Sequence, residues 1–301
     1  QIIVELIKLA SLIITLNKSM ACADRVAGIL DVKSSMGYKN ENGTINVENT
    51  DSDMAVEFDH VTFTYEGAGA SSLSDISFQA KKGQTIGIIG GTGSGKSTLI
   101  SLIPRFYDVT DGKITIDGKD IRNVSQHELR EKLGYVPQKA VLFSGDIASN
   151  ILYGNPDGSE AEMTEAATIA QATEFIEQKK KKYKSTISQG GSNVSGGQKQ
   201  RMTIARALVR KPEILILDDS ASALDFATDA ALRKSIKEMK NQPTVFIVSQ
   251  RAASIQHADQ IIVLDDGAMA GIGTHEELLK DCPIYQEIYY SQFPKEAVIN
   301  G

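Results

Sequence analysis

A glycine-rich segment, 90-GGTGSGKST-98, constrains the fold of this chain more than any other feature. It satisfies the phosphate-binding pattern G-x-x-x-x-G-K-[ST] and directly follows the apolar run 85-TIGII-89. Glycines at these points let backbone N–H groups turn toward phosphate oxygens without obstruction by a Cβ atom. The pattern predicts a β-strand that ends in a phosphate-binding loop, the P-loop, and continues as a helix.

The polar side chains of this loop have predicted roles toward a nucleotide. Lys96 would place positive charge on the β- and γ-phosphates, and the Ser97 hydroxyl is suited to ligate Mg²⁺. The helix that begins near Ser97 adds the positive end of its dipole. A glycine turn that arose by chance is the alternative explanation of the motif taken alone. The candidate ATP-binding residues of the loop are Gly90, Gly91, Thr92, Gly93, Ser94, Gly95, Lys96, Ser97 and Thr98.

A second motif, 214-ILILDD-219, joins an apolar strand to two carboxylates. We expect this strand to lie beside the P-loop strand and to place Asp218 near the metal ion. The alternative is structural, because a buried strand often ends in an Asp that caps the next helix. We favour the metal site because a P-loop precedes this strand in the same chain.

Apolar runs alternate with helical stretches from Thr85 onward, which indicates a parallel α/β sheet. Residues from about 140 to 210 are predicted to form a helical subdomain. Earlier in the chain, the strand-like alternation over 56–65 changes phase, which predicts a turn or bulge near His60. The runs predicted as strands of the parallel sheet are 85-TIGIIG-90, 214-ILIL-217, 244-TVFIV-248 and 261-IIVL-264.

The N-terminal segment is predicted to be helical. Residues 1–16 are strongly apolar but include a Glu and a Lys, so they are too short and too charged for a complete membrane span of about 20 residues. One interpretation is an amphipathic helix packed on the domain. We favour residues 1–31 as the end of a last transmembrane helix and its connecting helix, since the sequence does not begin with Met. The polar residues 32–54 are predicted to be a linker to a domain at 55–301.

Charge and cysteine content narrow the function classes. The net charge of -6 argues against a nucleic-acid partner, because such proteins usually present a basic face. The two cysteines, Cys22 and Cys282, lie near opposite ends of the chain and suggest neither a disulfide framework nor a metal site. A reducing, cytosolic environment is the interpretation that this cysteine pattern favours.

A third motif, 194-VSGGQKQR-201, precedes a helical stretch and the acidic strand. It resembles the signature motif of ABC-type ATPases, and the resemblance covers nearly everything from residue 55 to 290. The segments 103–121 and 266–279 are most similar to the exporter branch of that family.

Further motif residues take their roles from this resemblance. Tyr65 matches the aromatic residue that stacks on adenine, and Gln138 matches the glutamine that reaches Mg²⁺ and the attacking water. Asp225, in 222-SALD-225, matches the D-loop, which crosses to the opposing subunit. In the family the signature caps the γ-phosphate of ATP held by the partner, so that two chains sandwich two nucleotides. The signature residues that the resemblance places against the partner's ATP are Ser195, Gly196, Gly197 and Gln198.

The resemblance implies a fold and a set of partners. The fold is α/β, with a P-loop NTPase core of the RecA-like type, an antiparallel β subdomain and a helical subdomain. The implied ligands are ATP and Mg²⁺, with the metal held by Ser97, Gln138 and Asp218. The implied partners are a second ABC nucleotide-binding domain and the transmembrane domains of a transporter, at the cytoplasmic face of the cell membrane.

Three positions depart from the family pattern. Asp219 stands where the family has Glu as the group that polarises the attacking water, and its side chain is one methylene shorter. A general base has to lie within about 2.6–3.2 Å of its proton donor. Gln250 stands at the switch position, where the family has His, and an amide cannot take up a proton there. Gln189 replaces a Glu in a segment that communicates with the transmembrane domains, so either coupling is modified or the change is neutral.

This chain's own ATP site therefore lacks both residues that assist hydrolysis, whereas its signature is intact. That combination resembles the degenerate half of heterodimeric ABC exporters, many of them multidrug transporters. The predicted function is an ATPase domain with slow turnover at Asp219 and Gln250, whose signature completes the partner's site. Two alternatives remain, a soluble ABC ATPase outside transport and a regulatory ATP-binding module without turnover. The transported substrate is not predicted by the sequence.

Overall fold

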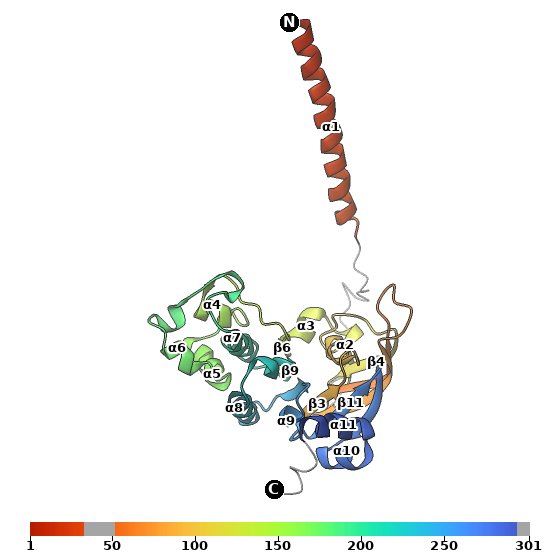
Figure 1. Ribbon diagram of the computed structural model, residues 1–301, viewed down its shortest axis with the longest axis vertical. Helices are drawn as coiled ribbons and strands as arrows, with labels where there is room; N and C mark the ends of the chain where they lie inside the picture. Colours follow the sequence, from red (N-terminus) through yellow and green to blue (C-terminus); the bar gives the residue numbers. More distant parts are fainter. Residues whose placement is uncertain (33–51, 294–301) are drawn as a thin grey trace. The chain divides into compact units, whose positions relative to one another are not determined.

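The computed structural model describes residues 1–32 and 52–293 (Figure 1). The predicted linker at 32–54 therefore lies almost entirely outside the described residues. The end of the predicted domain at 55–301 lies outside them as well.

The chain divides into two compact units, Gln1–Glu41 and Asn42–Gly301. In the first unit, α1 (Ile2–Leu30) is one uninterrupted helix with no buried residue. A Glu5–Lys8 ion pair of 2.9 Å, one turn apart, lies on its exposed surface. Across the two described ranges, no helix combines the length and the apolar character needed to cross a bilayer.

A six-stranded sheet forms the centre of the second unit, in the order β12-β11-β3-β10-β9-β6. The strands from β11 to β6 pair in parallel, and β12 adds an antiparallel edge. Strands β9 and β10 are buried at every position, which explains why their sequences are continuous apolar runs. The strands are β3 (Thr85–Gly90), β6 (Leu133–Val136), β9 (Ile214–Asp218), β10 (Thr244–Val248), β11 (Gln260–Asp265) and β12 (Ala268–Gly273).

A second, antiparallel sheet has the strand order β2-β1-β4-β5. Its pairing register shifts between Phe58 and Val61, and His60 adopts a left-handed backbone with φ 48°. The predicted irregularity near His60 is therefore confirmed. Gly112 faces this bulge, and a Cβ atom there would lie 2.3 Å from the His60 carbonyl oxygen. The strands are β1 (Met54–Phe63), β2 (Leu73–Lys81), β4 (Asp111–Ile116) and β5 (Lys119–Asp120).

The remaining helices form two groups. A cluster of helices, green to teal in Figure 1, occupies one side of the second unit. It consists of α4 (Ile147–Leu152), α5 (Glu160–Ile169), α6 (Thr173–Glu177) and α7 (Gly196–Leu208), with the short strands β7 (Gly145–Asp146) and β8 (Thr186–Ile187). The other helices are α2 (Lys96–Leu102), α3 (Gln126–Glu131), α8 (Phe226–Lys237), α9 (Ala252–Ile255), α10 (His275–Asp281) and α11 (Pro283–Gln292).

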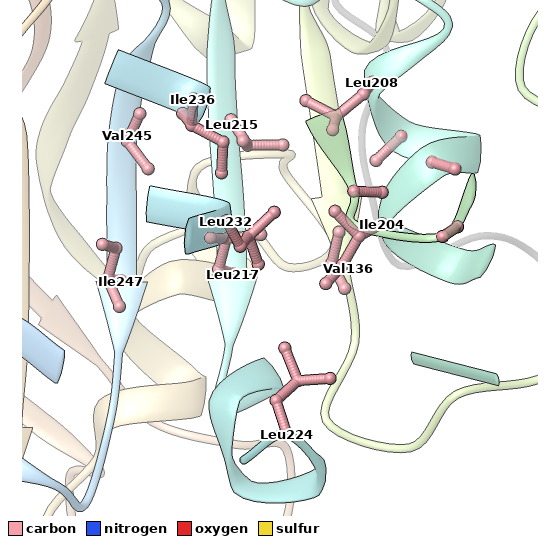
Figure 2. Close-up of a cluster of buried hydrophobic side chains, with 14 of the residues drawn as sticks. Val136, Ile204, Leu208, Leu215, Leu217, Leu224, Leu232, Ile236, Val245 and Ile247 are labelled. Carbon is pink, nitrogen blue, oxygen red and sulfur yellow. The ribbon is translucent and has the colours of Figure 1, made fainter. Parts of the chain in front are cut away.

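The core between the parallel sheet and its helices fixes the position of the strand ends. Leu232 and Ile236 of α8 pack with Leu215 and Leu217 of β9, while Ile204 of α7 closes the cluster on the side of β6 (Figure 2). Each of these side chains is at most 4% exposed. Burial of one such side chain contributes about 1.5–3 kcal/mol relative to exposure. The α/β fold predicted from the sequence is confirmed, with helices and sheets that hold the carboxyl ends of β3, β9 and β10 at one edge.

Candidate functional site

The loop between β3 and α2 is built around backbone approaches that only glycine permits. Gly90 ends β3, and a Cβ atom on it would lie 2.1 Å from the carbonyl oxygen of Leu264. Gly95 has φ +95°, and a Cβ atom there would lie 2.8 Å from the side chain of Leu73. A side chain at either position would push the loop away from strand β11 or from β2. The loop is thereby held open in front of the N-terminus of α2.

Lys96 begins α2 and folds back over this loop. Its Nζ donates hydrogen bonds to the carbonyl oxygens of Gly90 at 3.0 Å and Gly91 at 2.6 Å. Burial lowers the pKa of Lys96, and the nearby carboxylates of Asp219 and Asp218 act in the opposite direction. The ammonium group is thus positioned next to the loop, where a phosphate oxygen would give it a charged and stronger acceptor.

Ser97 and the acidic strand meet at the edge of the sheet. The Ser97 hydroxyl donates to Asp218 Oδ1 at 3.1 Å, and the Tyr135 hydroxyl donates to Asp218 Oδ2 at 3.4 Å. Burial raises the pKa of Asp218, and the hydrogen bonds from Ser97 and Tyr135 partly compensate. Sequence patterns do not single out Tyr135, because its contact with Asp218 depends on the pairing of β6 with β9.

One expectation about this strand was wrong. The acidic strand β9 does not lie beside the P-loop strand β3, because β10 pairs with both and separates them. Ser97 and Asp218 still meet because the strands are parallel, so that their carboxyl ends reach the same edge. A hydrogen bond of 3.1 Å between the Ser97 hydroxyl and the Asp218 carboxylate spans the carboxyl end of β10.

Asp219 lies at the start of a short 3₁₀ turn, Ser220–Ala223, with a left-handed backbone of φ 45° and ψ 31°. Its N–H donates to the carbonyl oxygen of Val248 at 3.0 Å, and its Oδ2 accepts from Gln138 Nε2 at 3.2 Å. Burial raises the pKa of Asp219, while hydrogen bonds from the Gln138 side chain and the Gln250 backbone lower it. The fold therefore brings Gln138 and the end of β10 to Asp219, although they lie far from it in the sequence.

Tyr65 follows β1 and leans on the first turn of α2. Its hydroxyl lies 3.1 Å from Thr98 Oγ1, and its ring makes edge contacts with Phe63 and Tyr107. Its side chain remains partly exposed, with 36% of its surface accessible. The aromatic ring thus lies beside the first turn of α2 and remains partly exposed.

A pocket of about 460 Å³ opens at the P-loop. It is lined by loop residues between Gly93 and Thr98 and by two segments that the sequence patterns missed, 70–72 and 266–267. The Asp-Gly turn at 266–267 is a local signal that points to a loop but carries no information on its distance from Lys96. A larger cavity of about 710 Å³ lies between α8, β10 and α9 and includes none of the predicted site residues.

The signature residues lie elsewhere, at the exposed start of α7. Ser195 is the N-cap of this helix, its hydroxyl accepts from Gln198 N at 3.3 Å, and Gln198 Oε1 accepts from Ser195 N at 3.2 Å. Gly196 is exposed, and Gly197 passes so close to the carbonyl oxygen of Ala223 that a Cβ atom would lie 3.1 Å from it. Figure 1 places α7 among the green and teal helices, apart from α2. Within one chain the two motifs do not form a common site.

Asp225 is the N-cap of α8, with its carboxylate accepting from Thr228 N at 2.8 Å and from Thr228 Oγ1 at 2.9 Å. These bonds lower the pKa of Asp225. Arg251, next to the switch residue Gln250, donates to the carbonyl oxygens of Ala221 and Leu224 in the turn before Asp225. The D-loop and the switch segment are therefore tied together.

Comparison with known proteins agrees with this architecture. The family described as "ABC transporter" matches residues 73–222, which span the P-loop, the signature and the acidic strand. The chain belongs to the family of ABC transporter ATP-binding domains, and several of its relatives are named as exporters.

Three relatives illustrate the relationship. The Bacillus subtilis protein named "Uncharacterized ABC transporter ATP-binding protein YfiB" is 43% identical over 95% of this chain and 48% of its own length. The "Probable multidrug resistance ABC transporter ATP-binding/permease protein YheI" of the same organism is 44% identical over 79% of this chain and 40% of its own length. A solved structure, described as a bacterial Atm1-family ABC exporter with ATP bound, superposes with a TM-score of 0.85 at 34% identity, over 93% of this chain and 48% of that chain. The chain thus spans about half the length of these relatives.

Proposed function

We propose that this chain is the ATP-binding half of a heterodimeric ABC exporter, with a slow site of its own and a signature that completes its partner's site. The observation that carries the proposal is the combination of an exposed, intact signature at Ser195 with Asp219 and Gln250 at the chain's own site. The family resemblance supports an exporter role, and the names of several relatives refer to multidrug export.

ATP would lie across the P-loop, with its base on Tyr65 and its phosphates at Lys96 and the N-terminus of α2. The partly exposed ring of Tyr65 and the position of Lys96 Nζ over the loop carbonyls support this orientation. Lys96 would exchange carbonyl oxygens for phosphate oxygens as the nucleotide enters. The N-terminus of α2 contributes backbone N–H groups and the positive pole of the helix dipole.

Mg²⁺ would be held by Ser97, Gln138 and Asp218. The donor set fits this ion, since it consists of hydroxyl, amide and carboxylate oxygens, and Mg²⁺ usually keeps one or two protein carboxylates together with phosphate oxygens and water. When bound, the ion neutralises charge on the phosphates. Hydrogen bonds already hold these side chains near one another, because Ser97 donates to Asp218 and Gln138 donates to the adjacent Asp219.

Asp219 would act on the attacking water with reduced efficiency. Its carboxylate accepts a hydrogen bond from Gln138 at 3.2 Å, so it cannot advance by the length of the missing methylene without breaking this bond. A displacement of about 1 Å in a catalytic group can cost on the order of 100-fold in rate. Gln250 adds an amide that can donate a hydrogen bond but cannot accept a proton in the reaction. Slow turnover at this site follows.

The signature requires a second nucleotide-binding domain. Ser195 and Gly196 are exposed at the N-terminus of α7, a helix of 13 residues whose end favours anions. In the proposed dimer this end meets the γ-phosphate on the partner, whose own site carries Glu and His at the two catalytic positions. The remaining partners would be transmembrane domains, with the chain at the cytoplasmic face of the membrane and without a nucleic-acid partner.

A steady-state ATPase assay on the reconstituted heterodimer tests the asymmetry. Ser195→Asp keeps an N-cap on α7, since Asp caps as well as Ser, but places a negative charge against the partner's γ-phosphate. It should lower kcat by about 100-fold, as expected when a donor to the transition state is lost. Asp219→Ala should lower kcat by no more than about threefold.

The matched control is Ser125→Asp, because Ser125 caps α3 in the same manner by accepting from Glu128 N at 3.1 Å. This change should leave kcat unchanged. A larger loss from Asp219→Ala than from Ser195→Asp would mean that the working site lies on this chain. Absence of phosphate release in every pairing would favour a regulatory ATP-binding module instead.

A further inference from the structure

The switch segment 249–252 is anchored at several backbone atoms. It follows β10, and the Ser249 N–H donates to the Ile88 carbonyl oxygen of the P-loop strand at 3.1 Å. One residue earlier, the Val248 carbonyl oxygen accepts from the N–H of Asp219 at 3.0 Å. Arg251 holds the other side of the segment through the carbonyl oxygens of Ala221 and Leu224, in the turn that leads to Asp225. The backbone of the switch segment is therefore connected to the P-loop strand, to the residue that carries the Asp219 carboxylate and to the D-loop.

One side chain from the C-terminal helix spans this segment. Gln292, at the end of α11, donates from Nε2 to the carbonyl oxygen of Gln250 at 2.8 Å. Its Oε1 accepts from the N–H of Ala252 at 2.9 Å. A single amide thus uses its donor and its acceptor on two backbone groups that flank Arg251.

The chemistry of this contact is specific to a side-chain amide of this length. The carbonyl of Gln250 needs a donor and the N–H of Ala252 needs an acceptor, and a primary amide offers both. A carboxylate supplies only acceptors, so Glu would satisfy Ala252 and repel the Gln250 carbonyl. Ala would satisfy neither group.

Helix α11 presents Gln292 from a fixed position. The helix packs against α9, β11 and β3, and its Tyr285 is fully buried. Pro283 at the first position sets the start of the helix. Because β3 carries the P-loop and α9 begins at Ala252, α11 contacts both the strand that ends in the nucleotide loop and the helix that follows the switch residue.

We propose that Gln292 is a positioning residue that holds the backbone of the switch residue Gln250 in place, and that α11 thereby affects the rate of ATP cleavage at this chain's own site. The inference rests on the proposed ATPase function of that site, and it adds the C-terminal helix as its regulator. Gln292 acts through Gln250 and touches neither the nucleotide nor the water itself.

The test measures amide hydrogen exchange by NMR on the full chain, together with ATP affinity and single-turnover ATP cleavage. In Gln292→Ala, exchange of the Ala252 amide should accelerate by roughly three- to tenfold, because that amide loses its acceptor. ATP affinity should stay the same, while cleavage should slow by a similar factor. In Gln292→Glu the Ala252 amide should stay protected, whereas cleavage should still slow because the Gln250 carbonyl loses its donor.

The control is Gln286→Ala, on the same helix, because Gln286 donates to the carbonyl oxygens of Leu279 and Lys280 and not to the switch segment. It should leave the Ala252 amide and the cleavage rate unchanged. Unchanged exchange at Ala252 in Gln292→Ala would overturn the proposal, and so would faster exchange with an unaltered cleavage rate. A parent chain that neither binds nor cleaves ATP would refute the proposed function instead, and the exchange rate alone would then decide whether Gln292 holds the switch segment.

Discussion

At the scale of single residues, Asp219 carries an unusual backbone conformation. Its φ of 45° lies in the left-handed region, which Asp and Asn visit more readily than residues with longer side chains. The same turn directs its carboxylate to Gln138 at 3.2 Å, and the buried setting raises its pKa. The left-handed backbone thus coincides with the position where the family has Glu.

Restoring the family's two residues should raise turnover. Asp219→Glu combined with Gln250→His is expected to increase the ATPase rate of the isolated chain on the order of tenfold or more, because it returns both the reach of the carboxylate and the imidazole. Each change alone should help less, since residues that act as a unit are non-additive. Asp219→Glu should also lower the melting temperature slightly because of its left-handed backbone.

Phosphate release under saturating Mg-ATP measures this rate. Lys96→Ala in the same background is the control, because loss of the ammonium group should remove both turnover and the thermal stabilisation that ATP gives. Fast turnover by the unmodified chain would contradict the slow-site interpretation.

At the scale of secondary-structure elements, several helices of this chain begin with the same pair of hydrogen bonds. In four helices the N-cap side chain and the residue three positions later satisfy each other's backbone N–H groups. The signature helix α7 is one of them, so Ser195 and Gln198 have a structural role in addition to the proposed one. The four pairs are Asp146 with Ser149, Ser159 with Glu162, Ser195 with Gln198, and Thr274 with Glu277.

The start of α5 should show a measurable pH dependence. Hydrogen bonds from Lys211 and then from Ser159 lower the pKa of Glu162 to about 2. Because the folded-state pKa lies below the unfolded value, this carboxylate stabilises the fold above pH about 4.5, and its contribution disappears as the pH falls toward about 2. Glu162→Gln keeps the capping geometry and removes the charge. It should lower the melting temperature near neutral pH, and the difference from the parent should shrink between pH about 5 and 2.

Melting curves recorded across that pH range give the comparison. Glu277→Gln is the matched control, since Glu277 also completes a capping box at Thr274 but has no lysine among the causes of its lowered pKa. Its pH-dependent difference should be smaller. Equal pH dependence in the two variants would show that Lys211 has no part in the effect.

At the scale of the whole molecule, every predicted site residue lies in the second unit. The two buried clusters of the core draw on residues between Ala55 and Phe293 only, within the described ranges. The P-loop, the acidic strand and the switch segment are all connected to the parallel sheet. The ATP site therefore depends on this unit for its geometry.

A chain that begins at Ser52 should consequently fold and keep its ATP site. Its affinity for Mg-ATP should agree with that of the full chain within about twofold, and its stabilisation by saturating ATP should be similar because that quantity depends on affinity and concentration. Isothermal titration and thermal melting of both chains provide the measurement. A loss of affinity greater than about tenfold would mean that residues 1–51 contribute to the site.

The sequence alone determined the family and the local structure of its motifs. The strands at 85–90 and 244–248 have the predicted bounds, and the phase change at His60 is present, because continuous apolar runs and alternation are local properties of a strand. The P-loop could be recognised because its glycines, Lys96 and Ser97 are neighbours in the chain. By contrast, the short strand β6, with its Gly134, does not stand out as an apolar run.

Only the tertiary structure decided which of these elements meet. No local pattern specifies that β10 separates β3 from β9, because sheet order depends on which helices cover which faces. The contact of Gln138 with Asp219 joins residues 81 positions apart, and Gln292 reaches Gln250 from 42 positions further along the chain. Such contacts arise from burial of the apolar faces of α8, α9 and α11 on one sheet, which brings distant polar groups to the same edge. Periodicity and motif spacing describe neighbours along the chain and therefore do not predict these contacts.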